Sequence, residues 1–270
     1  MREPVMRAVL MSVLVLLVSA GACLADYDRS KEWFHQMSYQ ERIRTQFLLV
    51  FTGDYAAPVD GMFGRLTYNA LTTFQSHREF PADGVLDAAQ QLILQRDGLD
   101  LVRRVGFETS KDATTGLTLG VPAKLFNPPL ATERGYRWRA HDGSIDLETW
   151  SQDLQATGYN ELYRQMTDAR AGRVVETKSF RNDYFVVAGR QDGRDFYTRV
   201  MKTPQDSRGF FLTWDPRHAV FMDRVAVAMS NSMTAYVAPP DGAQNNLSLA
   251  PAPKGDRLTP PAGSGKGSGS

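Results

Sequence analysis

The residue types that most often carry catalysis or bind metals are few and scattered in this chain. The four histidines lie far apart, and none has the His-x-His or His-Glu-x-x-His spacing that brings ligands onto one metal ion. Cys23 is the single cysteine, which excludes an intramolecular disulfide and leaves no free thiol for catalysis in a processed chain. The serine nucleophile motif Gly-x-Ser-x-Gly is also missing. We therefore predict no catalytic residue, no metal site and no cofactor.

Polar side chains do cluster around two Asp-Gly dipeptides in the first third of the chain. Asp60-Gly61, with Gly64 close behind, offers a tight turn in which glycine allows a positive φ at little steric cost. Helical apolar spacing follows at Ala70, Leu71 and Phe74. A second dipeptide, Asp83-Gly84, also leads into a helical pattern. The predicted unit is turn, helix, turn, helix.

One more helix precedes this unit. Ser38 and Glu41 have the spacing of a capping box, in which the hydroxyl and the carboxylate satisfy the free amides of a helix start. Apolar residues then recur at helical spacing, and Gly53 is expected to end the helix. This apolar stripe consists of Ile43, Phe47, Val50 and Phe51.

The third helix is expected to begin at Asp87, whose side chain can cap the amide of Gln90. Leu92 and Ile93 are predicted to point inward, and Gly98 to end the helix. The first part of the chain thus reads as an all-α three-helix bundle over 38–98.

The residues from Asp60 to Gln75 have the order Asp-Gly-x-Phe-Gly-x-x-Thr-x-x-Ala-x-x-x-Phe-Gln, and Asp83-Gly84-Val85 and Leu92 follow. This pattern resembles the peptidoglycan-binding-like domain. That family is a three-helix module attached to many bacterial cell-wall hydrolases, and the resemblance covers about 38–98. It implies peptidoglycan as the partner.

Within the resemblance, Arg65, Tyr68 and Gln75 are the candidate ligand-binding residues. An arginine can pair with stem-peptide carboxylates, a tyrosine can stack on a sugar, and a glutamine can bond peptide amides, although Gln75 could instead tie down a loop. Asp60 is also a candidate, either for glycan contact or for bonding the turn's own amides. Structural turn roles are expected for Gly61, Gly64, Asp83 and Gly84.

Both ends of the chain differ in composition from the middle. Residues 1–25 have the basic start, apolar run and small-residue zone of a signal peptide, with cleavage expected after Ala25. Cleavage before Cys23 is the alternative and would leave a lipidated, membrane-anchored cysteine. A lead-in is expected over 26–37, and the Pro/Gly/Ser-rich tail at 237–270 is expected to be disordered.

After a connector over 99–113, the apolar period changes from helical to alternating. A hairpin is predicted around Asp142-Gly143, a helix over about 151–169, four strands between 173 and 214, and a last helix over about 217–233. This pattern over 114–236 indicates an antiparallel sheet with two packed helices, so the chain is α+β overall. The order of elements resembles the Mog1/PsbP-like α+β fold, which implies a non-catalytic adaptor or ligand-holding domain.

These observations predict a secreted, periplasmic, non-enzymatic protein that binds peptidoglycan and holds its second domain at the cell wall. The second domain would contact another envelope protein or a small ligand. The near balance of 31 basic and 30 acidic residues gives no general attraction to nucleic acid. Two alternatives stay open. One is a cell-wall hydrolase or accessory subunit with an unrecognised active site in the second domain, where carboxylates such as Glu148, Asp153 and Glu161 could meet in space. The other is an interaction module that does not bind the wall.

Overall fold

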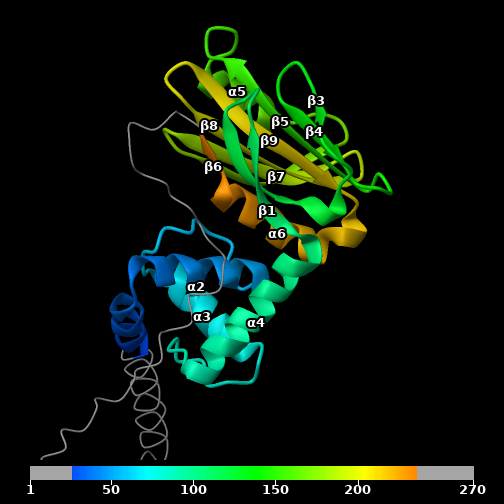
Figure 1. Cartoon of the computed structure of the whole chain (residues 1–270). Coiled ribbons are helices and arrows are strands. Elements are labelled where there is room, and N and C mark those ends of the chain that lie inside the picture. The colour runs from blue at the N-terminus through cyan, green and yellow to red at the C-terminus, as the bar shows by residue number, and fades with distance from the viewer. Residues whose placement is uncertain (1–25, 236–270) are drawn as a thin grey trace, which may run out of the picture.

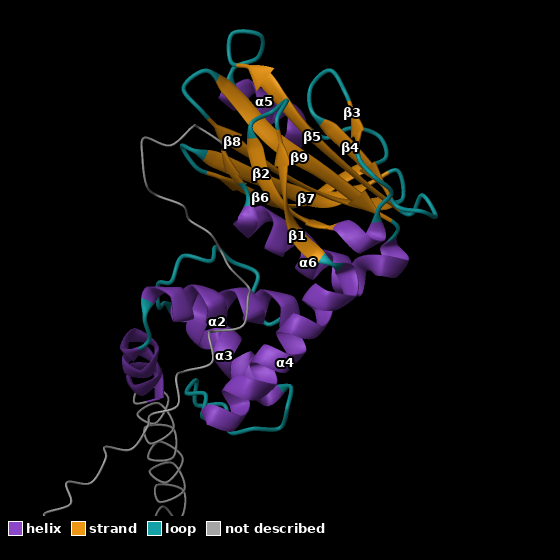
Figure 2. Cartoon of the chain, viewed as in Figure 1, coloured by secondary structure: helices purple, strands orange, loops and turns teal. Residues whose placement is uncertain are grey.

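The computed structural model describes residues 26–235 (Figures 1 and 2). The predicted signal peptide, Cys23 and the tail over 237–270 lie outside the described residues. Residues 26–36 are helical and are called the leading helix here. The other helices are α2 (Tyr39–Thr52), α3 (Arg65–Ser76), α4 (Ala88–Val105), α5 (Tyr159–Thr167) and α6 (Ala219–Ser232), with short 3-10 turns at Ala123–Leu125 and Pro216–His218.

The strands form two antiparallel sheets. The small sheet has the order β1-β2-β10, and the large sheet has the order β3-β4-β5-β9-β8-β7-β6. Their bounds are β1 (Phe107–Asp112), β2 (Leu117–Pro122), β3 (Leu130–Ala131), β4 (Tyr136–Arg139), β5 (Ile145–Asp153), β6 (Arg173–Phe180), β7 (Tyr184–Gln191), β8 (Arg194–Lys202), β9 (Asp206–Trp214) and β10 (Thr234–Ala235). The predicted α+β class is confirmed.

Helix α2 begins and ends where the sequence predicts. Ser38 is its N-cap with both bonds of the capping box present, and Gly53 ends it in the left-handed region at φ 86°. The predicted apolar stripe, from Ile43 to Phe51, is buried. Each such side chain stabilises the fold by about 1.5–3 kcal/mol when fully buried, so this stripe anchors the small bundle.

The two Asp-Gly turns have the conformation expected of them. Gly61 has φ 69° and Gly84 has φ 76°, both in the left-handed region that favours glycine. Gly64 differs from the prediction, because its φ of −158° is extended and it serves as the N-cap of α3. No steric need for glycine exists there, since a Cβ at Gly64 would meet no atom within 4 Å.

Helix α4 starts at its predicted cap, Asp87, but the prediction that Gly98 ends it is wrong. Gly98 lies inside the helix, where a Cβ would stand 2.8 Å from a methyl group of Leu48. The missing side chain therefore allows α4 to approach α2 closely. Leu92 was also expected inside the bundle, yet it is 68% exposed.

The predicted connector over 99–113 is wrong as well. Helix α4 continues to Val105 because Leu101 and Val105 extend its buried side, and Gly106 ends it in the left-handed region. The chain then enters β1 directly, which pairs with β2 along its whole length. Only Gly106 separates the last residue of α4 from the first residue of β1, so no loop connects the helical bundle to the sheet.

The predicted lead-in over 26–37 has more structure than expected. The leading helix buries Ser30 and Phe34 on one side, at helical spacing. Phe34 packs against Phe63 with ring centroids 5.6 Å apart, and the Ser30 hydroxyl donates to the carbonyl of Gly84 at 2.6 Å. Because one of the buried residues is a serine, the apolar residues of this segment alone do not show helical spacing.

The large sheet carries helices on both faces. The predicted hairpin is confirmed by the antiparallel pairing of β4 with β5, and the four strands predicted between 173 and 214 are β6 to β9. The helix predicted over 151–169 is shorter, because β5 runs to Asp153 and Gly158 is the N-cap of α5. Helix α5 covers a cluster on one face that includes Trp150, Phe185 and Phe196.

Helix α6 covers the opposite face and lies between the large sheet and α2 (Figure 1). One hydrophobic cluster runs from Phe47 and Phe51 of α2 through Val225 and Met229 of α6 to Leu212 of the sheet. Asn231 of α6 adds polar contacts. Its side chain accepts from the Val59 amide at 2.8 Å and donates to the Ala57 carbonyl at 3.2 Å, so it holds the loop between α2 and α3.

The capping box of α2 predicts a pH-dependent contribution to stability. Hydrogen bonds from Ser38 lower the pKa of Glu41 below its ordinary value. The carboxylate form is therefore favoured by folding, and its contribution is complete above about pH 5 and is lost as the pH falls through the lowered pKa.

We expect Glu41→Gln to reduce the free energy of unfolding at neutral pH and to have no effect in acid. Urea denaturation across this pH range measures the difference, with the exposed Glu108→Gln as the control. An equal effect of Glu41→Gln at every pH would contradict this account. Ser38→Ala should cost about 1 kcal/mol at neutral pH.

Candidate functional site

The first Asp-Gly turn is held by a buried glutamine that the sequence analysis did not single out. Gln46, 0% exposed, lies in the middle of α2. Its Oε1 accepts from the amides of Asp60 and Gly61 at 3.1 and 2.8 Å, and its Nε2 donates to the carbonyl of Met62 at 3.0 Å and to the Thr67 hydroxyl at 3.1 Å. The turn is thereby tied to the helix before it.

The second Asp-Gly turn is held in the same way by Gln75. This side chain is 0% exposed; its Oε1 accepts from the Gly84 amide at 2.7 Å, and its Nε2 donates to the carboxylate of Asp83 at 2.9 Å and to the carbonyl of Val85 at 3.0 Å. Gln75 is therefore not accessible to a ligand, and the structure places it in the loop-holding role that the sequence left open.

Both aspartates of the two turns also bond the turns themselves. Asp60 accepts from the Met62 amide at 2.9 Å, and Asp83 accepts from the Val85 amide at 3.0 Å. Asp60 remains exposed, whereas Asp83 is half-buried and forms an ion pair with Arg29 of the leading helix at 3.2 Å. The Asp60 side chain therefore stabilises its own turn and is still accessible to a ligand.

Arg65 and Tyr68 lie next to Tyr27 of the leading helix. The Arg65 guanidinium carbon lies 5.9 Å from the centre of the Tyr27 ring, and the rings of Tyr27 and Tyr68 meet edge to face at 5.2 Å. Tyr27 also packs against Phe63 at 5.2 Å. The leading helix therefore covers part of the surface that the sequence assigned to a ligand.

Large side chains remain exposed around the first turn and the start of α3. Met62 is 65% exposed, Leu66 is 63% exposed, and Arg65 is also exposed between them in sequence. Tyr39 is 54% exposed, and its ring lies beside Gly61. We call Tyr39, Asp60, Met62, Arg65 and Leu66 the turn face. These side chains offer an arginine, a carboxylate and apolar surface, which together suit a ligand with both polar groups and apolar faces.

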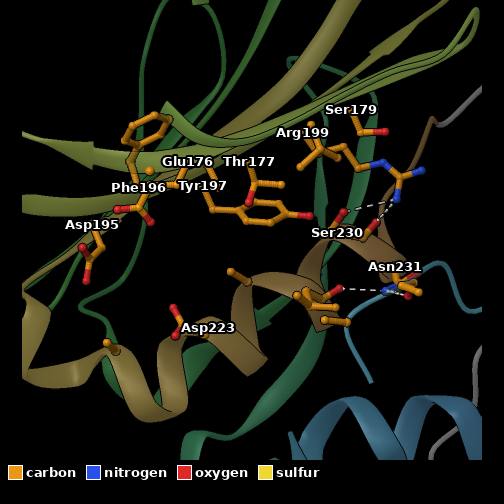
Figure 3. Close-up of a pocket in the computed structure, with 18 of the residues that line it drawn as sticks. Glu176, Thr177, Ser179, Asp195, Phe196, Tyr197, Arg199, Asp223, Ser230 and Asn231 are labelled. Atoms are coloured by element: carbon orange, nitrogen blue, oxygen red, sulfur yellow. Dashed lines mark hydrogen bonds between the residues drawn. The ribbon is translucent and has the colours of Figure 1, made fainter. Parts of the chain in front are cut away.

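A second candidate site is a cavity of about 660 Å³ between the large sheet, α6 and the α2–α3 loop (Figure 3). This volume is in the range that holds small ligands. Leu66 of the turn face lines its border, together with Ala57 and Pro58 of the loop. Strands β6 to β8 and helix α6 supply its polar lining, which includes Arg199, Asp195 and Asp223.

No group of three or more histidine, cysteine or carboxylate side chains suited to a metal ion occurs within residues 26–235. Glu148, Asp153 and Glu161 are the carboxylates that the sequence offers for an acid–base pair. Glu161 pairs with Arg164 on the same helix, and Asp153 accepts from the Gln155 amide at 2.7 Å.

Comparison with known proteins identifies the helical part of the chain. Residues 39–94 match the family described as "Putative peptidoglycan binding domain". The match contains α2, α3, both Asp-Gly turns and the start of α4, so the family suggested by the sequence pattern is confirmed for this region. A peptidoglycan-binding domain indicates a cell-envelope location.

A solved structure resembles the sheet part. It is the solution structure of a cyanobacterial PsbP (CyanoP) from Synechocystis sp. PCC 6803, with a TM-score of 0.37 and 12% identity, covering 48% of this chain and 92% of that one. A search of curated proteins finds no match. In the described part of the chain, every helix is too short or too polar to cross a bilayer.

Sequence reasoning missed Gln46, the leading helix and the cavity. Gln46 could have been found, because it is a polar residue directly before Phe47 in an otherwise apolar stripe, and each Asp-Gly turn has a glutamine on the helix before it. The cavity could not, because its lining comes from segments more than a hundred residues apart.

The hydrogen bonds between Gln46 and the first Asp-Gly turn predict that this side chain stabilises the helical domain. Gln46→Ala leaves the amides of Asp60 and Gly61 without their acceptor, while the Met62 carbonyl keeps its bond from the Thr67 hydroxyl. We expect a loss of about 2–4 kcal/mol in the free energy of unfolding. The exposed Gln40 on the same helix is the matched control, and Gln40→Ala should cost little. Urea denaturation compares the two; equal losses would show that Gln46 is not the anchor of the turn.

Proposed function

We propose that this protein is a secreted, non-enzymatic cell-envelope protein that binds peptidoglycan through the turn face of its helical domain. The family match over 39–94 is the observation that carries the proposal. In this role Arg65 pairs with a carboxylate of the wall peptide, Asp60 accepts hydrogen bonds, and Met62 and Leu66 cover apolar sugar or peptide surface.

Binding would also place the large sheet at the wall. Helix α6 is in contact with both α2 and the sheet, and Asn231 bonds the loop that leads into the first turn. A ligand held at the turn face would thus hold the sheet at a defined distance from it. We propose that the sheet domain supplies the specific task by contacting an envelope protein or a small ligand.

The absence of activity is part of the proposal. It is supported by the lack of thiol and serine-hydrolase motifs in the sequence and by the other bonds that Glu161 and Asp153 make. A hydrolase or an accessory subunit with an unrecognised site remains the rival. A fall in the turbidity of purified sacculi on addition of the protein would favour that rival.

Co-sedimentation with purified sacculi tests wall binding. We expect the wild-type chain to co-sediment, and Arg65→Ala to weaken binding about tenfold, the loss of a charge-assisted hydrogen bond of about 1.5 kcal/mol. Arg96→Ala removes another exposed arginine, on α4, and should bind like the wild type. Equal binding by both variants would refute the role of Arg65.

A second candidate function is an interaction module that does not touch the wall. It is favoured by the burial of Gln75 and by the contact of Tyr27 with Arg65 and Tyr68, since both reduce the surface open to a glycan. Under this alternative the leading helix is a permanent part of the domain.

Tyr27→Ala distinguishes the two functions. If peptidoglycan binds at Arg65 of the turn face, it competes with a cation–π contact worth about 0.5–1 kcal/mol, so the variant should bind sacculi about two- to fivefold more tightly. The gain should vanish when Arg65→Ala is added. If neither the wild type nor Tyr27→Ala co-sediments, the interaction module is the better description.

A further inference from the structure

The cavity between the large sheet and α6 has opposite charges at its two sides. Arg199, Tyr197 and Asp195 follow one another on alternate positions of β8, so their side chains lie on the face that α6 covers. Figure 3 shows the Arg199 guanidinium on one side of the Tyr197 ring, and Asp195 and Asp223 on the other.

The cationic side is built around an arginine that no carboxylate pairs with in the described part of the chain. The Arg199 guanidinium donates to the carbonyl and hydroxyl of Ser230 in the last turn of α6, and it lies 4.4 Å from the centre of the Tyr184 ring. These contacts hold it in place at the cavity wall. Desolvation lowers the pKa of Arg199, which is the expected sign of a partly buried cation whose charge lacks full compensation.

The acidic side has more carboxylates than cations. Glu176 of β6, Asp195 of β8 and Asp223 of α6 line the cavity, and Arg190 pairs with Asp195 at 3.0 Å. Although the Asp223 side chain is exposed, partial desolvation raises the pKa of its carboxyl, and the charges of Asp195 and Glu176 raise it further against the opposing charge of Arg224. Three carboxylates near the two guanidinium groups of Arg190 and Arg224 leave a surplus of negative charge, which a ligand cation would offset.

We propose that this cavity binds a small zwitterionic peptide, with its carboxylate at Arg199 and its ammonium group at Asp223 and Asp195. The volume of about 660 Å³ suits a ligand of that size. Between the charged sides, Ala188, Val186 and Tyr197 offer apolar and aromatic surface for short side chains. This inference concerns the sheet domain and does not depend on wall binding by the turn face.

Tri-alanine is the probe, and its N-acetylated and C-amidated forms each remove one of the two charges. Calorimetric titration of the full chain should show binding of free tri-alanine, with each blocked form binding about tenfold more weakly. If tri-alanine does not bind, or if all three forms bind alike, the proposal is wrong.

Protein variants then assign each charge to its side of the cavity. Arg199→Met should weaken binding of the free and N-acetylated peptides about tenfold and leave the amidated peptide unchanged. Asp223→Asn should weaken the free and amidated peptides and leave the N-acetylated peptide unchanged. Arg139→Met, an exposed arginine on β4, is the control and should change nothing.

Asp223 is exposed on α6, so Asp223→Asn should fold normally. If Arg199→Met fails to fold, as shown by loss of the cooperative thermal transition, the Asp223 comparison decides alone. Equal weakening of all three peptides by Asp223→Asn would overturn the proposed orientation.

Discussion

Helix α6 must bury two sides at once, and the arrangement of the whole molecule depends on this requirement. One side packs on the large sheet and the other on α2, so a single hydrophobic cluster runs through both halves of the chain. Asn231 adds directional bonds to the loop between α2 and α3, which apolar packing alone would leave free to slide. Removing α6 from either neighbour would expose a large apolar surface. The helical bundle and the sheet therefore share one hydrophobic cluster.

Within the bundle, the corresponding constraint is polar. Two Asp-Gly turns place backbone amides and carbonyls where no helix or strand can satisfy them, and Gln46 and Gln75 do so from inside the core. A glutamine amide can accept and donate at the same time, which is what a turn with free groups of both kinds requires. The glycines, by contrast, matter for their left-handed backbone conformation. The turns are thus part of the core, and only their outer side chains are left for ligands.

This division between inner and outer side chains explains how the family resemblance relates to function. Three residues of the sequence pattern, Gly61, Phe74 and Gln75, are buried and hold the fold together. Arg65, Met62 and Leu66 are exposed but lie at positions where the pattern allows any residue. A family match over 39–94 therefore identifies the scaffold, while the ligand depends on the outer side chains and on the leading helix that lies against them.

The sequence by itself determined the local elements. Capping residues, apolar periods and Asp-Gly turns act over a few neighbours, so α2, the start of α4, the hairpin and β6 to β9 could be predicted from them. Tertiary structure decided whatever depends on a partner distant in sequence. Helix α4 continues past Gly98 because Leu101 and Val105 are buried further along it, and Leu48 packs against the glycine. Gln75 is buried because Asp83 and Val85 close over it, and Arg199 reaches a cavity only because α6 returns to the sheet. These outcomes depend on how segments far apart in the sequence pack against one another. A pattern of neighbouring residues does not encode the distance or the orientation between such segments.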